Sequence, residues 1–158
     1  MSQRRVVGIA QMVICRAPDQ LACLGLGSCV AVIVYDPSTK IGGIVHVLLS
    51  KAPTKCNDPE KYADTGTRKL VSEMILKGAK KEKLVAKLVG GAQMFSRLNL
   101  SIADIGRLNL EVARRTLREL GVPVVASDIG GTHGRSAIMD TLTGKVTIEA
   151  AFSPVRVI

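Results

Sequence analysis

The sequence predicts an α+β fold in which mixed or antiparallel β-sheet layers are covered by two amphipathic helices. Apolar runs of strand length cluster toward both ends of the chain, two segments with a helical period lie between them, and Gly, Pro, Asp and Asn separate the runs. Strands gathered at both ends differ from the regular strand–helix alternation of a parallel α/β sheet. A length of 158 residues predicts a single domain, residues 1–158.

The predicted strands are short apolar or alternating runs bounded by turn-forming residues. They are residues 6–15, 29–35, 41–49, 84–89, 122–126, 135–139 and 146–152. Residues 50–60 form the longest predicted loop, and the glycine-rich residues 130–134 form a second one.

The first predicted helix has Asp58 as N-cap and Pro59 at its first helical position, and it ends near Gly78. Its apolar face holds Ala63, Thr67, Leu70, Val71, Met74 and Ile75. The second helix runs from about Gly106 to Leu120, with Gly121 as the residue that ends it. Its apolar face holds Leu108, Val112, Ala113, Leu117 and Leu120.

The composition narrows the functional classes. Lys and Arg exceed Asp and Glu by 22 to 13, a net charge of +9, but only 3% of residues are aromatic. Scarce aromatic side chains weigh against nucleic acid as a partner, because single strands and RNA are usually bound by stacking. The basic stretch from Lys77 to Lys87 is typical of a solvated surface. No apolar run approaches the about 20 residues of a membrane span, so we expect a cytoplasmic protein without membrane insertion.

Four cysteines occur without a CxxC pair, which indicates neither a zinc ribbon nor a redox dithiol. We therefore expect free thiols. Cys29 stands out because it follows Gly25 and Gly27 at the start of an apolar strand. A thiol flanked by free main-chain N–H groups suits acyl transfer, since those donors stabilise an oxyanion.

A cysteine nucleophile needs a base, and the chain holds only His46 and His133. If Pro37 and Ser38 are the centre of a two-residue turn, a hairpin sets Cys29 directly opposite His46. A three-residue loop sends the two side chains to opposite faces, whereas a four-residue loop keeps them on one face with a diagonal offset. His133 lies in the flexible glycine-rich loop, where a base is poorly held, so we interpret it as a surface residue.

Six segments taken together are similar to a known family. Residues 25–30, 42–46, 61–64, 90–95, 105–109 and 128–135 resemble, in order and at similar spacing, the chemoreceptor glutamine deamidases, the CheD family. The resemblance implies the fold shared by CheD and the deamidases of cytotoxic necrotizing factor type. It also implies hydrolysis of glutamine side chains on chemoreceptors, the methyl-accepting chemotaxis proteins, without a metal or an organic cofactor, and regulation by a CheC-type phosphatase.

The same resemblance implies that Cys29 is the nucleophile and His46 its base, with His46 lowering the pKa of the thiol. Six residues before the nucleophile the family usually has a threonine that orients the histidine, whereas this chain has Cys23. Either the Cys23 thiol or a backbone carbonyl of the same segment is then the orienting acceptor. This departure leaves a second hypothesis open, a module without turnover that binds a CheC-type phosphatase; the charge alone motivates a third, a nucleic-acid binder.

Overall fold

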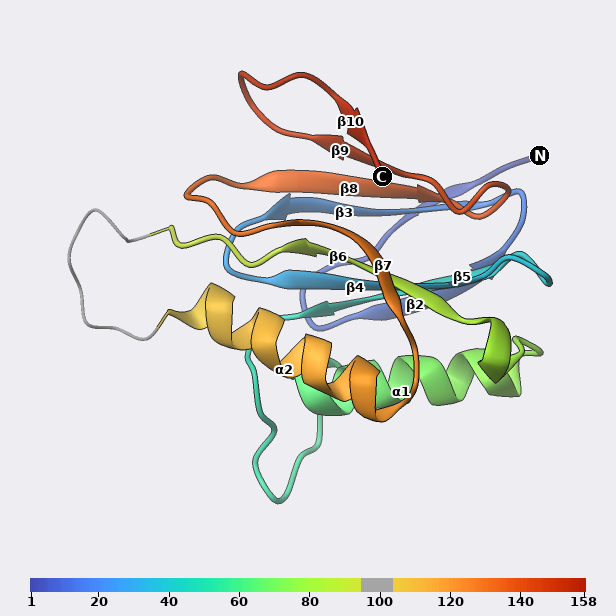
Figure 1. Ribbon diagram of the computed structural model, residues 1–158, viewed down its shortest axis with the longest axis horizontal. Helices are drawn as coiled ribbons and strands as arrows, with labels where there is room; N and C mark the ends of the chain where they lie inside the picture. Colours follow the sequence, from blue (N-terminus) through green and yellow to red (C-terminus); the bar gives the residue numbers. More distant parts are fainter. Residues whose placement is uncertain (95–103) are drawn as a thin grey trace.

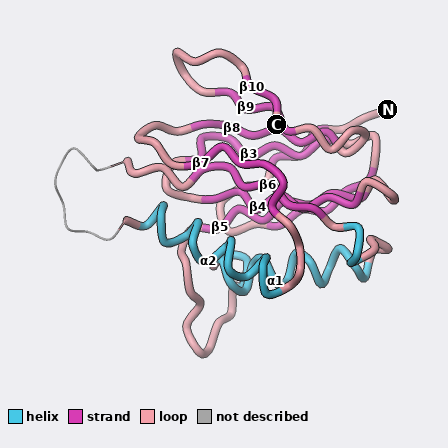
Figure 2. Tube along the Cα trace, in the orientation of Figure 1, coloured by secondary structure: helices cyan, strands magenta, loops and turns pink. Residues whose placement is uncertain are grey.

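The computed structural model describes residues 1–94 and 104–158, and Figures 1 and 2 show the path of the chain. The strands are β1 (Arg4–Val6), β2 (Met12–Arg16), β3 (Gln20–Leu26), β4 (Val30–Asp36), β5 (Ile41–Val47), β6 (Val85–Gly90), β7 (Val124–Ile129), β8 (Arg135–Asp140), β9 (Val146–Glu149) and β10 (Arg156–Val157). The helices are α1 (Ala63–Leu76) and α2 (Ile105–Glu119), and 3₁₀ turns lie at Pro59–Lys61 and Lys81–Lys83.

In the described ranges the strands form two five-stranded sheets. The outer sheet has the order β1-β3-β8-β9-β10, and the central sheet has the order β2-β5-β4-β6-β7. The pairs β1–β3 and β6–β7 are parallel and the other pairs are antiparallel. Both helices cover one face of the central sheet, and the outer sheet covers the other (Figure 1). The predicted α+β fold with mixed sheets and two covering helices is confirmed.

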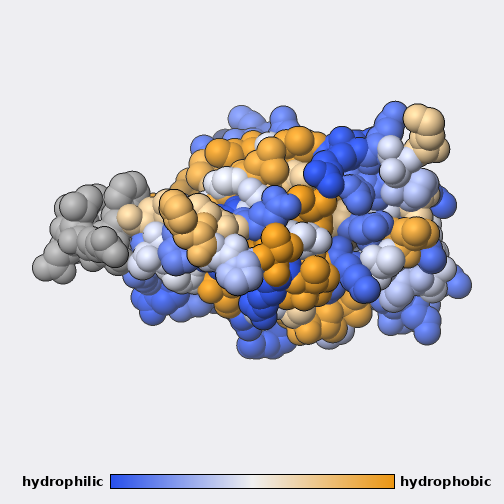
Figure 3. All heavy atoms as spheres, turned by 90° about the horizontal axis from the view of Figure 1, so that it is seen from above, coloured by the Kyte–Doolittle hydropathy of each residue, from blue (hydrophilic) through white to orange (hydrophobic). Residues whose placement is uncertain are grey.

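The helices, the central sheet and the outer sheet form three layers, which enclose two separate cores. One lies between the helices and the central sheet, and it includes Leu70, Met74 and Leu117. The other lies between the two sheets, and it includes Leu21, Leu26 and Met139. The free face of the outer sheet has no helical cover in the described ranges, and Figure 3 shows apolar and hydrophilic residues interleaved there.

The strand predictions were partly wrong at the N-terminal end. Residues 6–15 form no single strand, because β1 ends at Val6 and β2 begins at Met12 in the other sheet. The strands β3 and β10 were not predicted. In β3, Gly25 lies inside the strand at a positive φ of 63°, where the pairing with β8 shifts register between Cys23 and Leu26. A glycine that supports a bulge within a strand looks like a loop signal in the sequence.

The first helix begins later than predicted. Asp58 makes no side-chain cap, and Pro59–Lys61 form a 3₁₀ turn that precedes α1. Of its predicted face, Ile75 is exposed, whereas the other five residues are buried. In α2 the buried face is confirmed at Val112, Ala113 and Leu117, while Leu108 is exposed. No helix in residues 1–94 and 104–158 is long and apolar enough to cross a membrane.

The turn between β4 and β5 sets the register of the hairpin. Asp36 pairs with Ile41, so residues 37–40 form a four-residue loop, and His46 pairs with Ala31. The direct pairing of Cys29 with His46 was therefore wrong, and the diagonal alternative holds. The buried carboxylate of Asp36 fixes the turn: it accepts hydrogen bonds from the Ser38 N–H at 2.8 Å and the Lys80 N–H at 2.7 Å.

Asp36→Asn is expected to destabilise the protein at pH 7. Burial works to raise the pKa of Asp36, but hydrogen bonds from Lys80, Ser38 and Thr39 outweigh it and lower the pKa from 3.8 to about 2. The amide of the variant cannot accept from both sides, so the free energy of unfolding should fall by about 1–3 kcal/mol in urea titrations.

The pH dependence gives the control for this prediction. Because the folded-state pKa is depressed, the contribution of Asp36 is present above pH 3.8 and is lost as the pH falls toward 2. The variant should lack this part of the acid destabilisation. Equal stability of both proteins at pH 7 would contradict the assigned role of the turn.

Candidate active site

The three predicted site residues converge between the two sheets. Odd-numbered residues of β4 belong to the core between the sheets and even-numbered ones to the core under the helices. Cys29 continues the odd-numbered series into the inter-sheet core. On β5, His46 has the same parity as Ile44, which lies in that core, and Cys23 reaches it from β3. The site thus sits at the end of the layer where β3 turns into β4.

A backbone carbonyl orients the histidine. The His46 Nδ1 lies 3.1 Å from the carbonyl oxygen of Val7. Since a carbonyl only accepts, Nδ1 carries the proton and Nε2 is left with its lone pair. The Val7 peptide is itself fixed, because its N–H donates to the Ala22 carbonyl at 2.8 Å. The Cys23 thiol donates to the same Val7 carbonyl, with sulfur and oxygen 3.6 Å apart.

The contact between His46 and the Val7 carbonyl shows which group orients the histidine. Of the two acceptors considered, the orienting group is a main-chain carbonyl, and the Cys23 side chain lies behind it as a second donor. The carbonyl comes from the chain between β1 and β2, and not from the segment of Cys23. Val7 was missed because a carbonyl is present at every residue and gives no signal in the sequence.

Burial sets the protonation of the pair. Relative exposures of 7% for Cys29 and 3% for His46 remove both side chains from water. Burial raises the pKa of the Cys29 thiol and lowers that of the His46 imidazole, with the Val7 hydrogen bond working against the latter shift. Burial, with a smaller effect from Cys29, also raises the pKa of Cys23 to about 12. These directions oppose the expectation that His46 lowers the pKa of Cys29, and they favour a neutral thiol and a neutral imidazole at rest.

The chain around Cys29 is anchored by its carbonyls. The Gly27 carbonyl accepts from the Ala92 N–H and the Cys29 carbonyl from the Gly91 N–H, both at 2.9 Å. Gly90, at a φ of 109°, makes this approach possible, since a Cβ there would lie 2.3 Å from the Cys29 oxygen. Between them, the Ser28 carbonyl accepts from the Asn109 side chain at 3.0 Å.

The N–H groups of Ser28 and Cys29 are not used in these main-chain hydrogen bonds. Within residues 1–94 and 104–158, both N–H groups donate to no main-chain acceptor. A thiol beside two main-chain donors and a neutral imidazole with a free Nε2 has the parts that acyl transfer requires.

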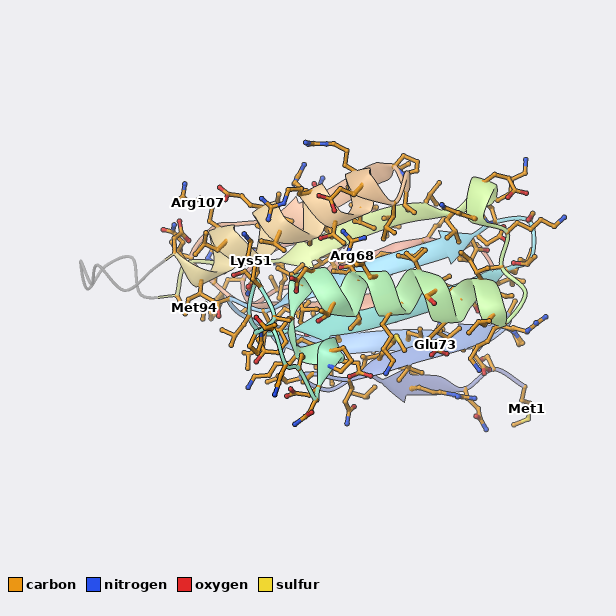
Figure 4. The ribbon with its side chains drawn as sticks, turned by 90° about the horizontal axis from the view of Figure 1, so that it is seen from below. Met1, Lys51, Arg68, Glu73, Met94 and Arg107 are labelled. Carbon is orange, nitrogen blue, oxygen red and sulfur yellow. The ribbon has the colours of Figure 1, made fainter. Side chains whose placement is uncertain are left out.

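Several segments far apart in the sequence border this end of the molecule. Met94 lies against Gly27, and Figure 4 shows Met94, Lys51 and Arg107 at the same end. The family-like segments 90–95 and 105–109 meet here too, although Phe95 lies outside the described residues. His133 is exposed in the turn between β7 and β8, as predicted. No group of three His, Cys, Asp or Glu side chains in the described part of the chain is arranged to hold a metal ion.

The fold and the site define an α+β domain with a buried thiol–imidazole pair between two sheets. Comparison with known proteins agrees with the family-like segments. Residues 48–150 match the family model described as CheD chemotactic sensory transduction. The chain belongs to the CheD family.

Two relatives illustrate the similarity. A probable chemoreceptor glutamine deamidase CheD of Desulforamulus reducens is 41% identical over 96% of this chain and 93% of its own length. A protein of the same description from Pyrococcus horikoshii is 44% identical over 89% of this chain and 88% of its own. Among solved structures, the Bacillus licheniformis hypothetical protein YfiH aligns over 77% of this chain and 49% of its own length, at a TM-score of 0.48 and 16% identity.

Alkylation by iodoacetamide tests the neutral pair. Cys56 is half-buried in the loop before α1 and should react first, followed by Cys29. Cys15 and Cys23 should lag, because burial raises their thiol pKa values to about 11 and about 12. The Cys29 rate should still be rising with pH above 8, since only the thiolate reacts and burial raises its pKa. Peptide mapping that finds a Cys29 rate already constant at pH 6 would indicate a thiolate–imidazolium pair instead.

Proposed function

We propose that this chain is a protein-glutamine deamidase that converts glutamine side chains of chemoreceptors to glutamate and releases ammonia. The observation that carries the proposal is the family membership, with relatives named for this activity aligned along nearly the whole chain. The buried Cys29–His46 pair, with Nδ1 held by a carbonyl, supports it chemically. Neither partner of this pair requires a metal or an organic cofactor.

In the first half-reaction, Nε2 of His46 accepts the proton of the Cys29 thiol as sulfur attacks the carboxamide carbon. A carbon–sulfur bond forms and the carbonyl electrons move to oxygen, giving a tetrahedral oxyanion. The N–H groups of Ser28 and Cys29 are the donors available to it. The carbon–nitrogen bond then breaks, the amide nitrogen takes the proton from His46, and ammonia leaves a thioester on Cys29.

In the second half-reaction, His46 removes a proton from water, which attacks the thioester carbon. The carbon–sulfur bond breaks, and sulfur recovers its proton from the imidazolium. The sum is glutamine and water giving glutamate and ammonia. A neutral resting pair suits this cycle, because thiol deprotonation is then coupled to attack and a buried thiolate is not held between turnovers.

The substrate and the partners follow from the family. A chemoreceptor segment rich in glutamate and glutamine would be attracted by the +9 charge at low ionic strength. Action on the cytoplasmic part of a receptor would place the enzyme in the cytoplasm. Binding of a CheC-type phosphatase rests on the resemblance alone, and we propose that it requires no turnover, so Cys29→Ala should retain it.

Cys29→Ala should reduce ammonia release to background, because the nucleophile is lost. His46→Ala should reduce kcat by about 10²–10⁴-fold, the usual contribution of general acid–base catalysis. The assay is intact-mass analysis of a receptor cytoplasmic fragment, which gains about 1 Da for each glutamine converted, as ammonia is replaced by water. Cys15→Ala is the matched control, since it removes another buried thiol from the same core. Turnover at the parent rate in Cys29→Ala would refute the mechanism.

Variants of Cys23 test whether the Val7 carbonyl or the Cys23 side chain orients His46. This matters because the missing threonine is what raised the hypothesis of a module without turnover. Because the Val7 carbonyl orients His46, Cys23→Thr and Cys23→Ala should each keep kcat within about threefold of the parent, far from the about 100-fold loss that follows misplacement of a catalytic group. Measuring kcat of both variants on one receptor fragment decides the matter. A faster Thr variant beside a much slower Ala variant would instead make the Cys23 side chain the orienting group.

A further inference from the structure

Asn109 connects helix α2 to both strands that carry the site. Its side chain is fully buried, and Nδ2 donates to the carbonyls of Ser28 and Leu48, each at 3.0 Å. Ser28 immediately precedes the nucleophile, and Leu48 follows the end of the strand that holds His46. One amide group therefore fixes the two chain segments relative to each other.

The contact to Ser28 has a direct consequence for the Cys29 N–H. The carbonyl of residue 28 and the N–H of residue 29 belong to one planar trans peptide, so they point in opposite directions. Drawing the Ser28 carbonyl toward α2 turns the Cys29 N–H away from α2, and within the described ranges this N–H donates to no main-chain acceptor. In the proposed reaction the tetrahedral oxyanion forms next to the sulfur of Cys29, so an N–H group on that side of the peptide can donate to it.

The neighbouring anchors cannot replace this contact. The carbonyls of Gly27 and Cys29 are held by main-chain N–H groups, whereas the carbonyl between them is held by a side chain. Asn109 also has a cost, because its Oδ1 is buried without a hydrogen-bond partner in the described part of the chain. A leucine has the same branched skeleton and no unsatisfied Oδ1, but it would leave the Ser28 and Leu48 carbonyls without this donor, so the two hydrogen bonds and not packing account for asparagine.

We propose that Asn109 is a positioning residue that locks the Ser28–Cys29 peptide so that the Cys29 N–H faces the oxyanion of the deamidation reaction. The inference rests on the proposed function for its catalytic consequence. It concerns the orientation of a main-chain donor, and not the reactivity of the thiol. The two can be measured separately, because alkylation of sulfur by iodoacetamide passes through no oxyanion.

The test compares Asn109→Leu and Asn109→Asp with the parent chain. Asn109→Asp keeps the shape but has no donor when ionised and only one O–H donor when protonated, so it cannot hold both carbonyls and serves if the leucine variant does not fold. Thr116→Val is the matched control, because Thr116 is buried on the same helix and its hydroxyl bonds only to Val112 within α2. For each protein we would measure kcat and KM for ammonia release from a receptor fragment, the alkylation rate of Cys29, and the amide resonance of Cys29.

For Asn109→Leu and Asn109→Asp, kcat should fall by about 10–100-fold with KM nearly unchanged, as expected when one oxyanion donor is misdirected. The alkylation rate should stay within about threefold of the parent, because thiol reactivity follows its pKa and access. The Cys29 amide resonance should move, while Thr116→Val changes none of these. An unchanged kcat, or a parallel loss of alkylation and turnover, would overturn the proposal.

The amide resonance also separates this inference from the proposed function. If the parent chain itself releases no ammonia from receptor fragments, the proposed function fails, and the Cys29 resonance still reports whether Asn109 sets the peptide orientation. A Cys29 resonance that stays in place in both Asn109 variants would overturn the inference whatever the activity of the parent.

Discussion

The register of β4 against β5 is the constraint on which the site depends. Side chains alternate between the two faces of a strand, so a slip of one residue would send His46 to the helix side while Cys29 stayed between the sheets. The four-residue turn excludes that slip, and the buried Asp36 carboxylate holds the turn through three separate N–H and O–H donors on Ser38 and Lys80. A carboxylate at one end of the hairpin thus determines which side chains meet at the other end.

At that other end the main chain supplies most of the functional groups. The Val7 carbonyl selects the tautomer of His46, and the N–H groups of Ser28 and Cys29 remain for a substrate oxygen. In the proposed reaction, only the thiol and the imidazole are contributed by side chains. Both are buried between two sheets, which favours the neutral form of each and would make the transfer of one proton part of the attack itself.

The sequence predicted those features that depend on a short stretch of residues. Helical periodicity predicted most of the buried faces of both helices, the Asp-Pro turn predicted the β4–β5 hairpin, and the family-like segments pointed to Cys29 and His46, which the fold brings to the same end of the inter-sheet core. Three features had no such signal. Strand β3 was hidden by Gly25, which supports a bulge in a strand but resembles a loop residue. Without β3 the sequence did not predict an outer sheet that buries the Cys29 thiol, so it could not predict that burial raises the pKa of this thiol. The role of the Val7 carbonyl depends on tertiary packing alone.

The protonation of His46 tests the central claim of a neutral pair held by a backbone carbonyl. Long-range ¹H–¹⁵N correlation spectra of the imidazole distinguish its two neutral tautomers from the imidazolium. At pH 7 the account predicts a neutral ring with the proton on Nδ1 and a bare Nε2, because burial lowers the pKa from 6.5 and the Val7 carbonyl accepts from Nδ1. A ring with protons on both nitrogens at pH 7, or with its proton on Nε2 alone, would contradict it.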